Sequence, residues 1–593
     1  IECLIVYQPS YEPYLPVTEK SNPITRDIDR ANPEEIVQML QKCDAEIFER
    51  TSHGNPMYQT LCSSSVVQTI VEVSKRVEVI LKDPEDSLIV LSGCGTSGRI
   101  AFLLATSLNR WLASHHQKQI YSYIIAGGDN KHVLALLFCL HEQACVGKKH
   151  VLFIGISCGL SAPFVAGQLD FCLRNLKIIT PVLIGFNPVD MARTEPIQNC
   201  SFHFKEIAER MNELQKQKKA YVLNPAVGPE AISGSSRMKG GSATKVILET
   251  ILLAGHEAAC NNKAITFNGI LHSLNKFEKV HQITYSHTKE LAALVEKAAV
   301  SLRRKGHVYY LGWQTLGIIG IIDASECIPT FGAGFEDIRG FVSNGFSEMN
   351  NKEGDLSSLG PHFIIDHKDF VHTILPNLSD NDTVIFLYSE NGKQYLEPNL
   401  ITVVLALSHS IIKHHLNATS HLSIGTDHIH PIMVTIYPSY KHYISKWYTL
   451  NCAIFFLIQK QHCELSTKWC LNAISTGAHV LTGKVYMNYM IDLRVTNSKL
   501  YRRAIHILKR FTGSTQAYCE TALLRAIYGI EELSDGMSST NVTQHTLVAN
   551  ERGSVVPIAL VMLQSRGTIA EAKSYLDAYS VIRDAVAACQ RLL

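Results

Sequence analysis

The stretch SLIVLSGCGTSGRIAFLL, residues 87–104, decides the fold that this sequence predicts. It begins with an apolar run, Ser87 to Leu91, that is typical of a buried β-strand, and it ends with an apolar helical run from Ile100. The loop between them consists mostly of glycine, serine and threonine. Because a strand, a glycine-rich turn and a helix in this order place an anion at the helix N-terminus, the stretch favours a parallel α/β sheet with a phosphate site. The loop is not a Walker loop, since no Gly-Lys-Ser/Thr closes it.

Further strands and hydroxyl-rich loops follow this first unit. Apolar runs at 121–126, 151–156 and 180–186 alternate with helical segments, which predicts a doubly wound parallel sheet. The second of these runs leads into SCGLSAP (157–163), and GSSRMKGGSATK (234–245) opens another apolar helix. Each loop taken alone is equally well explained as a helix cap. Three such loops at one sheet edge favour a site for a phosphate ester.

The sequence then repeats itself at an offset near 220 residues, as a tandem duplication does. Gly312 takes the place of Gly93 in a second loop after a strand, an offset of 219 (312 − 93). Lys468 takes the place of Lys245 in a second apolar helix, an offset of 223 (468 − 245). The two halves therefore predict two similar domains that pack as a pseudo-dimer.

The second copy of the loop has lost the small residues of an anion site. Trp313, Gln314 and Leu316 stand where the first copy has cysteine, glycine and serine. Bulky side chains there would fill the space that a phosphate needs, so we expect one phosphate site, in the first half. Glu326 and Lys499 are the polar groups that the second half offers to a ligand. The alternative interpretations are that Glu326 is a solvated carboxylate at a helix end and that Lys499 is a surface lysine.

Composition and charge exclude several classes of function. The formal net charge of the 593 residues is +2, which gives no electrostatic footprint for nucleic acid or an anionic membrane. No apolar run has the length of a membrane-spanning helix. The 16 cysteines are too sparse for a disulfide scaffold, and neither a CxxC pair nor zinc-type spacing occurs. We therefore expect reduced thiols in an intracellular protein, with no metal and no cofactor.

Several of these motifs resemble the sugar isomerase (SIS) domain. They are GCGTSG (93–98), ISCGLS (156–161) and GSSRMK (234–239). Within this class the sequence resembles the glucokinase regulatory protein family and its bacterial relatives, the N-acetylmuramic acid 6-phosphate etherases. The stretch DASECIPTFG (323–332) also resembles the etherases. The resemblance extends over nearly the whole chain.

The resemblance implies a fold of two tandem, doubly wound parallel-sheet SIS domains that form a pseudo-dimer, followed by an α-helical C-terminal lid domain. We expect an N-terminal arm at 1–32 and a first SIS domain, which binds sugar phosphate, at 33–262. A second, decayed SIS domain is expected at 263–484 and the lid at 485–593.

The function that the resemblance implies is regulation rather than catalysis. Members of this family bind and inhibit glucokinase, in competition with glucose, and retain it in the nucleus. Fructose 6-phosphate strengthens the inhibition and fructose 1-phosphate relieves it, both at one site between the SIS domains. For this chain we expect a 1:1 complex with glucokinase, a monomer in its absence, and a location in nucleus and cytoplasm.

The matching motifs carry the family's site onto two groups of residues in this sequence. The group that would surround the phosphate is Thr96, Ser97, Ser157, Cys158, Gly159, Ser235, Ser236 and Arg237. The group that would contact the sugar from across the domain interface is Glu326, Asn497, Lys499 and Arg503.

The sequence departs from the family pattern at two places. The family has a Glu-x-x-Glu-Asp run after an Ala-Gly-Gly that stands here at 126–128, whereas this sequence has only Asp129 before Glu142. The segment 437–461 is also unlike the family. The alternative function is an etherase-type lyase, but elimination needs both a base and an acid, and only Glu326 is a candidate. A hexose-phosphate isomerase would need a base and a ring-opening acid that the sequence does not place.

Overall fold

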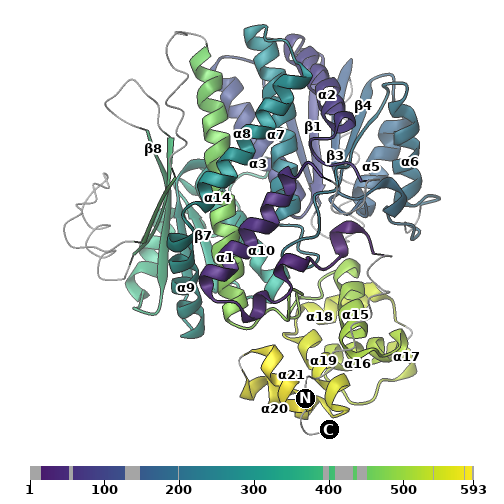
Figure 1. The fold of residues 1–593 in the computed structure, drawn as a ribbon, viewed down its shortest axis with the longest axis vertical. Coiled ribbons are helices and arrows are strands. Elements are labelled where there is room, and N and C mark those ends of the chain that lie inside the picture. The colour runs from purple at the N-terminus through teal and green to yellow at the C-terminus, as the bar shows by residue number, and fades with distance from the viewer. Residues whose placement is uncertain are drawn as a thin grey trace.

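The computed structural model describes residues 15–51, 58–126, 147–197, 200–391, 400–407, 432–436 and 451–590, without 539 and 580. Figure 1 shows two sheets with long helices between them and a helical unit at one end of the molecule. The sheets and the helical unit follow one another along the chain. This order confirms the predicted class of two tandem SIS domains and a lid, while the predicted boundaries between the domains stay predictions.

The first domain is a parallel sheet with helices on both faces. Its strand order is β2-β1-β3-β4-β5, and every pair of neighbours is parallel. α2, α3 and α7 pack on one face and α5 and α6 on the other. The elements are β1 (Ser87–Cys94), β2 (Tyr121–Ala126), β3 (His150–Ile156), β4 (Ile179–Ile184), β5 (Tyr221–Leu223), α2 (Ser64–Lys82), α3 (Thr96–Ser114), α5 (Pro163–Arg174), α6 (Phe204–Gln215) and α7 (Lys239–Asn261).

The second domain has a mixed sheet of order β10-β9-β8-β6-β7. β6 (Val308–Gly312) is parallel to β7 (Ile338–Val342) and to β8 (Thr383–Asn391), as the duplication predicts. β9 (Leu400–Leu407) and β10 (Ile432–Ile436) extend this parallel part with antiparallel pairs, which the sequence analysis did not predict. The short connection from β8 to β9 explains why β9 runs antiparallel to β8, since it has fewer than the dozen or so residues that a parallel crossover needs.

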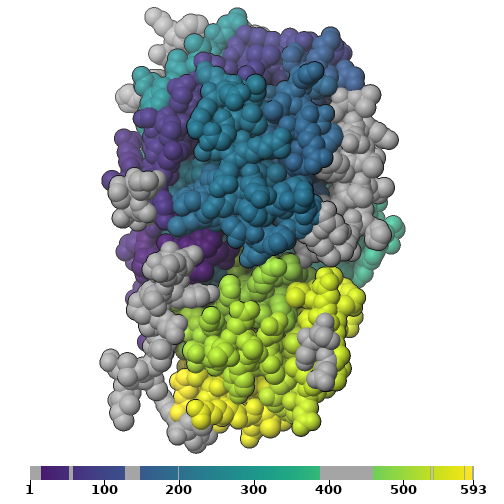
Figure 2. Space-filling view, turned by 90° about the vertical axis from the view of Figure 1, so that its right-hand side faces the viewer, coloured from purple at the N-terminus to yellow at the C-terminus, as the bar shows by residue number. Residues whose placement is uncertain are grey.

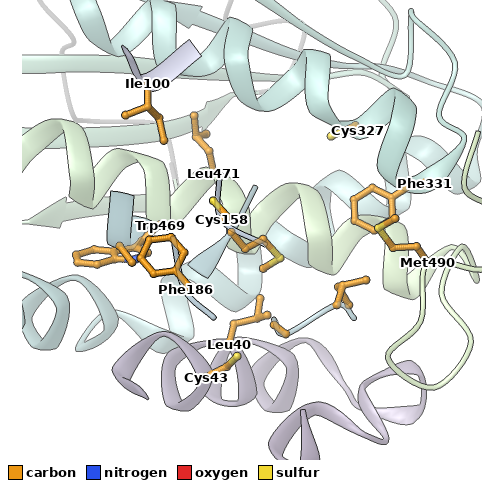
Figure 3. Close-up of a cluster of buried hydrophobic side chains, with 14 of the residues drawn as sticks. Leu40, Cys43, Ile100, Cys158, Phe186, Cys327, Phe331, Trp469, Leu471 and Met490 are labelled. Atoms are coloured by element: carbon orange, nitrogen blue, oxygen red, sulfur yellow. The ribbon is translucent and has the colours of Figure 1, made fainter. Parts of the chain in front are cut away.

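The two domains share one apolar core, in which helices from both halves meet. Figure 3 shows side chains of this core, among them Leu40 of α1, Phe331 of α10 and Trp469 of α14. The Trp469 ring is fully buried and meets the edge of the Phe48 ring at a centroid distance of 6.5 Å. The interface is therefore packed like a domain interior. Its helices are α1 (Pro33–Ala45), α8 (Phe267–Tyr285), α9 (Thr288–Arg303), α10 (Gln314–Phe331) and α14 (Asn451–Leu481). The short helix α11 (Gly345–Met349) packs against this core and accepts a hydrogen bond from Arg110 of α3 through Glu348, and α12 (His367–Asp369) belongs to the second domain.

Helix caps begin several elements where the sequence patterns place them. Asn32 forms a capping box with Glu35 at the start of α1, and Thr568 forms one with Glu571 at the start of α20. Among the described helices none is by itself long and apolar enough to cross a membrane, although the bent pair of α18 and α19 passes that test.

The lid is a bundle of short helices that packs under the first domain, and the N-terminal arm lies between them (Figure 2). The arm consists of three short turns, η2 (Val17–Glu19), η3 (Pro23–Thr25) and η4 (Ile28–Arg30). Its Asp29 accepts two hydrogen bonds from the Arg583 guanidinium of the lid, at 2.6 and 2.8 Å. The arm therefore ties the beginning of the chain to its end. The lid helices are α15 (Ser498–Thr512), α16 (Gln516–Tyr528), α17 (Asp535–Ser538), α18 (Val542–Asn550), α19 (Val555–Ser565), α20 (Ile569–Ala578) and α21 (Ile582–Gln590).

Candidate functional site

The N-terminus of α3 is the part of the first domain that is best suited to an anion. Gly95 precedes the helix with a φ of +54° and offers no side chain to cap it. Gly98 allows the turn to close on the strand, because a Cβ there would lie 2.6 Å from the Gly93 carbonyl oxygen. The first backbone N–H groups of α3, at Thr96 and Ser97, therefore form the positive end of a long helix that has no side-chain cap.

A second loop from β3 lies beside this helix start. The Ser157 hydroxyl accepts hydrogen bonds from the Ser161 and Ala162 amides, at 3.0 and 3.2 Å, and so holds the loop that leads into α5. The Cys158 thiol lies 3.5 Å from the Ser97 hydroxyl, and burial raises the pKa of this thiol, which keeps it neutral near pH 7. The predicted residues of the first two loops are thus brought together.

The Gly159 carbonyl belongs to the support of this loop. It accepts a hydrogen bond of 3.0 Å from the Asn187 amide, and that amide also donates to the Thr18 hydroxyl of the arm at 3.1 Å. The backbone of the Ser157 loop is therefore fixed from the side of the N-terminal arm.

The third predicted loop, around Ser235 and Ser236, meets the lid. The Ser235 hydroxyl is buried and has no hydrogen-bond partner among the described residues, whereas Ser236 is half-buried. Gly234 has a φ of +79°, and a Cβ there would lie 2.4 Å from the Cζ atom of Arg503. Only glycine leaves room for this guanidinium, so the loop and the first helix of the lid fit one another at this point.

Arg237 faces the second domain instead of an open site. Its Nη1 donates to Asp323 at 2.9 Å, and its Nη2 donates to the Ser475 and Thr476 hydroxyls at 3.1 and 2.8 Å. The guanidinium is 3% exposed and lies over the Phe331 ring. Because its planar fork suits a carboxylate as well as a phosphate, the sequence pattern did not separate the two partners. Arg237 therefore joins the two domains in this structure, and its place around the phosphate stays a prediction.

Glu326 of the second domain meets the start of α3, and its contact with a sugar stays a prediction. Its Oε1 accepts a hydrogen bond of 2.5 Å from the Thr96 hydroxyl and lies 3.4 Å from Nη1 of Arg99. The carboxylate is almost fully buried, so it is a fixed part of the site and not a solvated helix-end group. One acceptor of the second domain therefore stands at the first turn of α3.

The first turns of α15 bring the lid into the site. Asn497 caps this helix by accepting from the Leu500 amide at 3.0 Å. Arg503 donates to Glu19 of the arm at 2.6 Å. Burial lowers the pKa of Lys499 and the neighbouring Arg503 lowers it further, while Glu19 partly offsets both effects. The Lys499 ammonium makes no hydrogen bond within the described ranges, and it lies close enough to Cys158 for each group to influence the pKa of the other.

Three further residues of the site escaped the sequence analysis. Glu19 lies in the arm, which has no periodic pattern, and Lys468 was recognised as a copy of Lys245 without a function. The Lys468 ammonium donates to the Arg237 carbonyl at 2.8 Å and holds the start of α7. Glu230 caps α7 with its carboxylate, which accepts from the Lys239 and Gly240 amides. The α7 N-terminus is therefore occupied by the protein's own carboxylate, and α3 remains as the anion site.

The corresponding loop of the second domain keeps the close strand–helix contact but carries bulky residues. Gly312 and Gly317 approach one another as closely as Gly93 and Gly98 do. Trp313 follows, stacked on one aromatic ring of β8 at a centroid distance of 6.3 Å. The described part of this half offers no cradle of small hydroxyl residues.

The fold and the site together define a tandem SIS-domain protein with a C-terminal lid. Profiles of glucokinase regulatory protein match its N-terminal SIS domain at 72–136 and 139–173, its second SIS domain at 285–482 and its C-terminal lid domain at 487–586. The glucokinase regulatory proteins of Xenopus laevis and Homo sapiens are 45% and 46% identical over 97% of this chain and 93% and 92% of their own.

The chain belongs to the glucokinase regulatory protein family. An N-acetylmuramic acid 6-phosphate etherase of Bacillus licheniformis is 29% identical over 40% of the chain and 69% of its own length. Because the full-length relatives are regulatory proteins and the etherases match only part of the chain, this chain is a regulator and not an enzyme.

Proposed function

We propose that the chain is a sugar-phosphate-sensing regulator that binds and inhibits glucokinase in competition with glucose. One observation carries this proposal: the site is shared by three parts of the molecule. Thr96 belongs to the first domain, Glu326 to the second and Lys499 to the lid. A ligand that touches all three changes how they sit relative to one another only if it binds two arrangements with different affinity.

Fructose 6-phosphate and fructose 1-phosphate are the two effectors in this proposal, and no cofactor takes part. The phosphate of either ester lies at the N-terminus of α3, where Ser97 and the Lys499 ammonium face it. The sugar extends toward Glu326, and the two esters present different hydroxyl groups to that carboxylate. Fructose 6-phosphate strengthens the inhibition and fructose 1-phosphate relieves it.

The complex with glucokinase contains one copy of each protein, and the chain alone is a monomer. Its location in nucleus and cytoplasm, with retention of glucokinase in the nucleus, completes the proposal. The support is the family membership. Fractionation of cells that express the chain with and without fructose 1-phosphate tests the location, and a glucokinase that stays nuclear under both conditions contradicts it.

The test of the function is an inhibition assay with purified glucokinase, the chain and each ester. Inhibition should increase with fructose 6-phosphate and decrease with fructose 1-phosphate. Lys499→Ala should weaken the binding of both esters roughly tenfold or more, since one charge-assisted hydrogen bond contributes about 1.5–3 kcal/mol. Lys573→Ala, an exposed lysine of the same lid, is the matched control. Inhibition that neither ester changes would refute the proposal, and turnover of N-acetylmuramic acid 6-phosphate would favour the lyase.

A further inference from the structure

A buried carboxylate lies next to the proposed sugar-phosphate site and touches none of its ligand-facing groups. Glu230 Oε2 accepts from the Lys239 amide at 2.9 Å, and its Oε1 accepts from the Gly240 amide at 2.8 Å. The residue is 4% exposed. Its carboxyl group therefore closes the N-terminus of a 23-residue helix, in the place where the sequence pattern predicts a bound phosphate.

Few ionisable groups face this carboxylate, and most of them are anionic or neutral. Burial raises the pKa of Glu230 to about 7, although the two amides and the Lys239 ammonium lower it. Lys239 is itself paired with Glu46 of η5 (Glu46–Phe48), so its charge is shared. The remaining groups that interact with Glu230 are Asp44 and Cys43 of α1 and Cys158 after β3.

Two glycines of α7 pack tightly between Glu230 and the two anion loops. A Cβ on Gly240 would lie 3.0 Å from Glu230 Oε1 and 3.4 Å from the Cys158 sulfur. A Cβ on Gly241 would lie 3.1 Å from Cγ2 of Thr96. The carboxyl group therefore packs behind the two loops that form the anion site, in a buried environment that strengthens the interaction between charges.

We infer that Glu230 is a positioning residue of this site, which holds the start of α7 behind the anion loops and takes up a proton when a sugar phosphate binds. The inference rests on the proposed function. A phosphate dianion at α3 disfavours a second negative charge behind it, so binding shifts Glu230 toward its protonated form. The protonated group still accepts from one amide, which keeps α7 in place.

The experiment is isothermal titration calorimetry of the full chain with fructose 1-phosphate at pH 7. Titrations in two buffers of different ionisation enthalpy give the number of protons bound with the ligand. We expect an uptake of a measurable fraction of a proton, and at most about half, because a carboxyl group that titrates near pH 7 is already half protonated there. The ionisation of the ligand's own phosphate contributes equally in all variants.

Glu230→Gln should lose this uptake while it still binds the ester. Glu249→Gln is the matched control, since Glu249 is another buried carboxylate of α7 that lies further along the helix and is paired with Lys245. It should keep the uptake of the unmodified chain. Where Glu230→Gln does not fold, Glu230→Asp retains an ionisable group and should keep an uptake of reduced size.

The outcomes separate this inference from the proposed function. Uptake that Glu230→Gln abolishes and Glu249→Gln preserves supports the inference. Binding of fructose 1-phosphate without uptake in the unmodified chain overturns the inference alone, and so does uptake that persists in Glu230→Gln. No binding to the unmodified chain overturns the proposed function and this inference with it.

Discussion

Gly234→Ala is the substitution that tests most directly whether the lid completes the site. The added Cβ would lie 2.4 Å from Arg503 Cζ, whereas ordinary contacts begin near 3.4 Å. The guanidinium must therefore move by about 1 Å, which stretches its 2.6 Å hydrogen bond to Glu19 beyond the usual limit. The positive φ adds about 1–2 kcal/mol of backbone strain to the folded state.

The backbone strain must be separated from the displaced guanidinium. Gly513→Ala does this. Gly513 ends α15, the helix that carries Arg503, with a φ of +67°, and a Cβ there would have nothing within 4 Å. Both variants should lose a similar 1–2 kcal/mol of unfolding free energy from the backbone. Only Gly234→Ala should also lose affinity for fructose 1-phosphate, roughly ten- to a hundredfold for one charge-assisted interaction.

The assay is a fluorescence or calorimetric titration of both variants with fructose 1-phosphate, beside urea unfolding of each. Equal affinities in Gly234→Ala and Gly513→Ala would refute the reasoning, because Arg503 would then be displaced without consequence for the ligand. A loss of affinity in Gly513→Ala would also refute it, since that residue touches nothing near the site.

Three further predictions concern stability. Lys245→Met leaves two buried glutamates unpaired and should cost about 3–5 kcal/mol in urea unfolding; a cost below about 1 kcal/mol would contradict the buried pairing. Asp29→Asn should make the lid more sensitive to protease by weakening the bond from Arg583, and an unchanged cleavage pattern would argue against the arm as its tether. Burial raises the pKa of Asp44 to about 6, so its contribution to stability is fully present below about pH 4 and is lost as the pH rises through 6. Thermal unfolding of Asp44→Asn between pH 4 and 7 should lack this dependence; an unchanged slope would show that another group causes it.

The repeated part of the fold was predictable because equivalent residues of the two domains recur at a nearly constant offset in the sequence. Gly93 and Gly98 recur as Gly312 and Gly317, and both pairs make the same close contact between strand and helix. Steric constraints of this kind admit only glycine, so they survive as a sequence signal. The expected loss of an anion site from the second loop also follows from the sequence, since Trp313 is too large for an anion cradle.

The partners of the charged residues were not predictable in the same way. Arg237 suits a phosphate and a carboxylate equally well, and only the packed fold brings Asp323 within 2.9 Å. Glu230 becomes a helix cap because the loop before α7 folds back, which no local pattern indicates. The antiparallel direction of β9 was not predictable either, because an apolar run does not encode strand direction.

The contact between Asp29 and Arg583 also bears on how the chain is made. The two residues are 554 positions apart, so the arm has no lid to bind until synthesis is nearly finished. At about 5–20 residues per second, the ribosome needs roughly half a minute to two minutes to add that length. The first domain and its arm therefore fold before the arm's contact with the lid can form, and the proposed site acquires its lid residues last. A nascent chain that stops before α21 (Ile582–Gln590) carries both SIS domains and still lacks Arg583, whose hydrogen bonds to Asp29 join the lid to the arm.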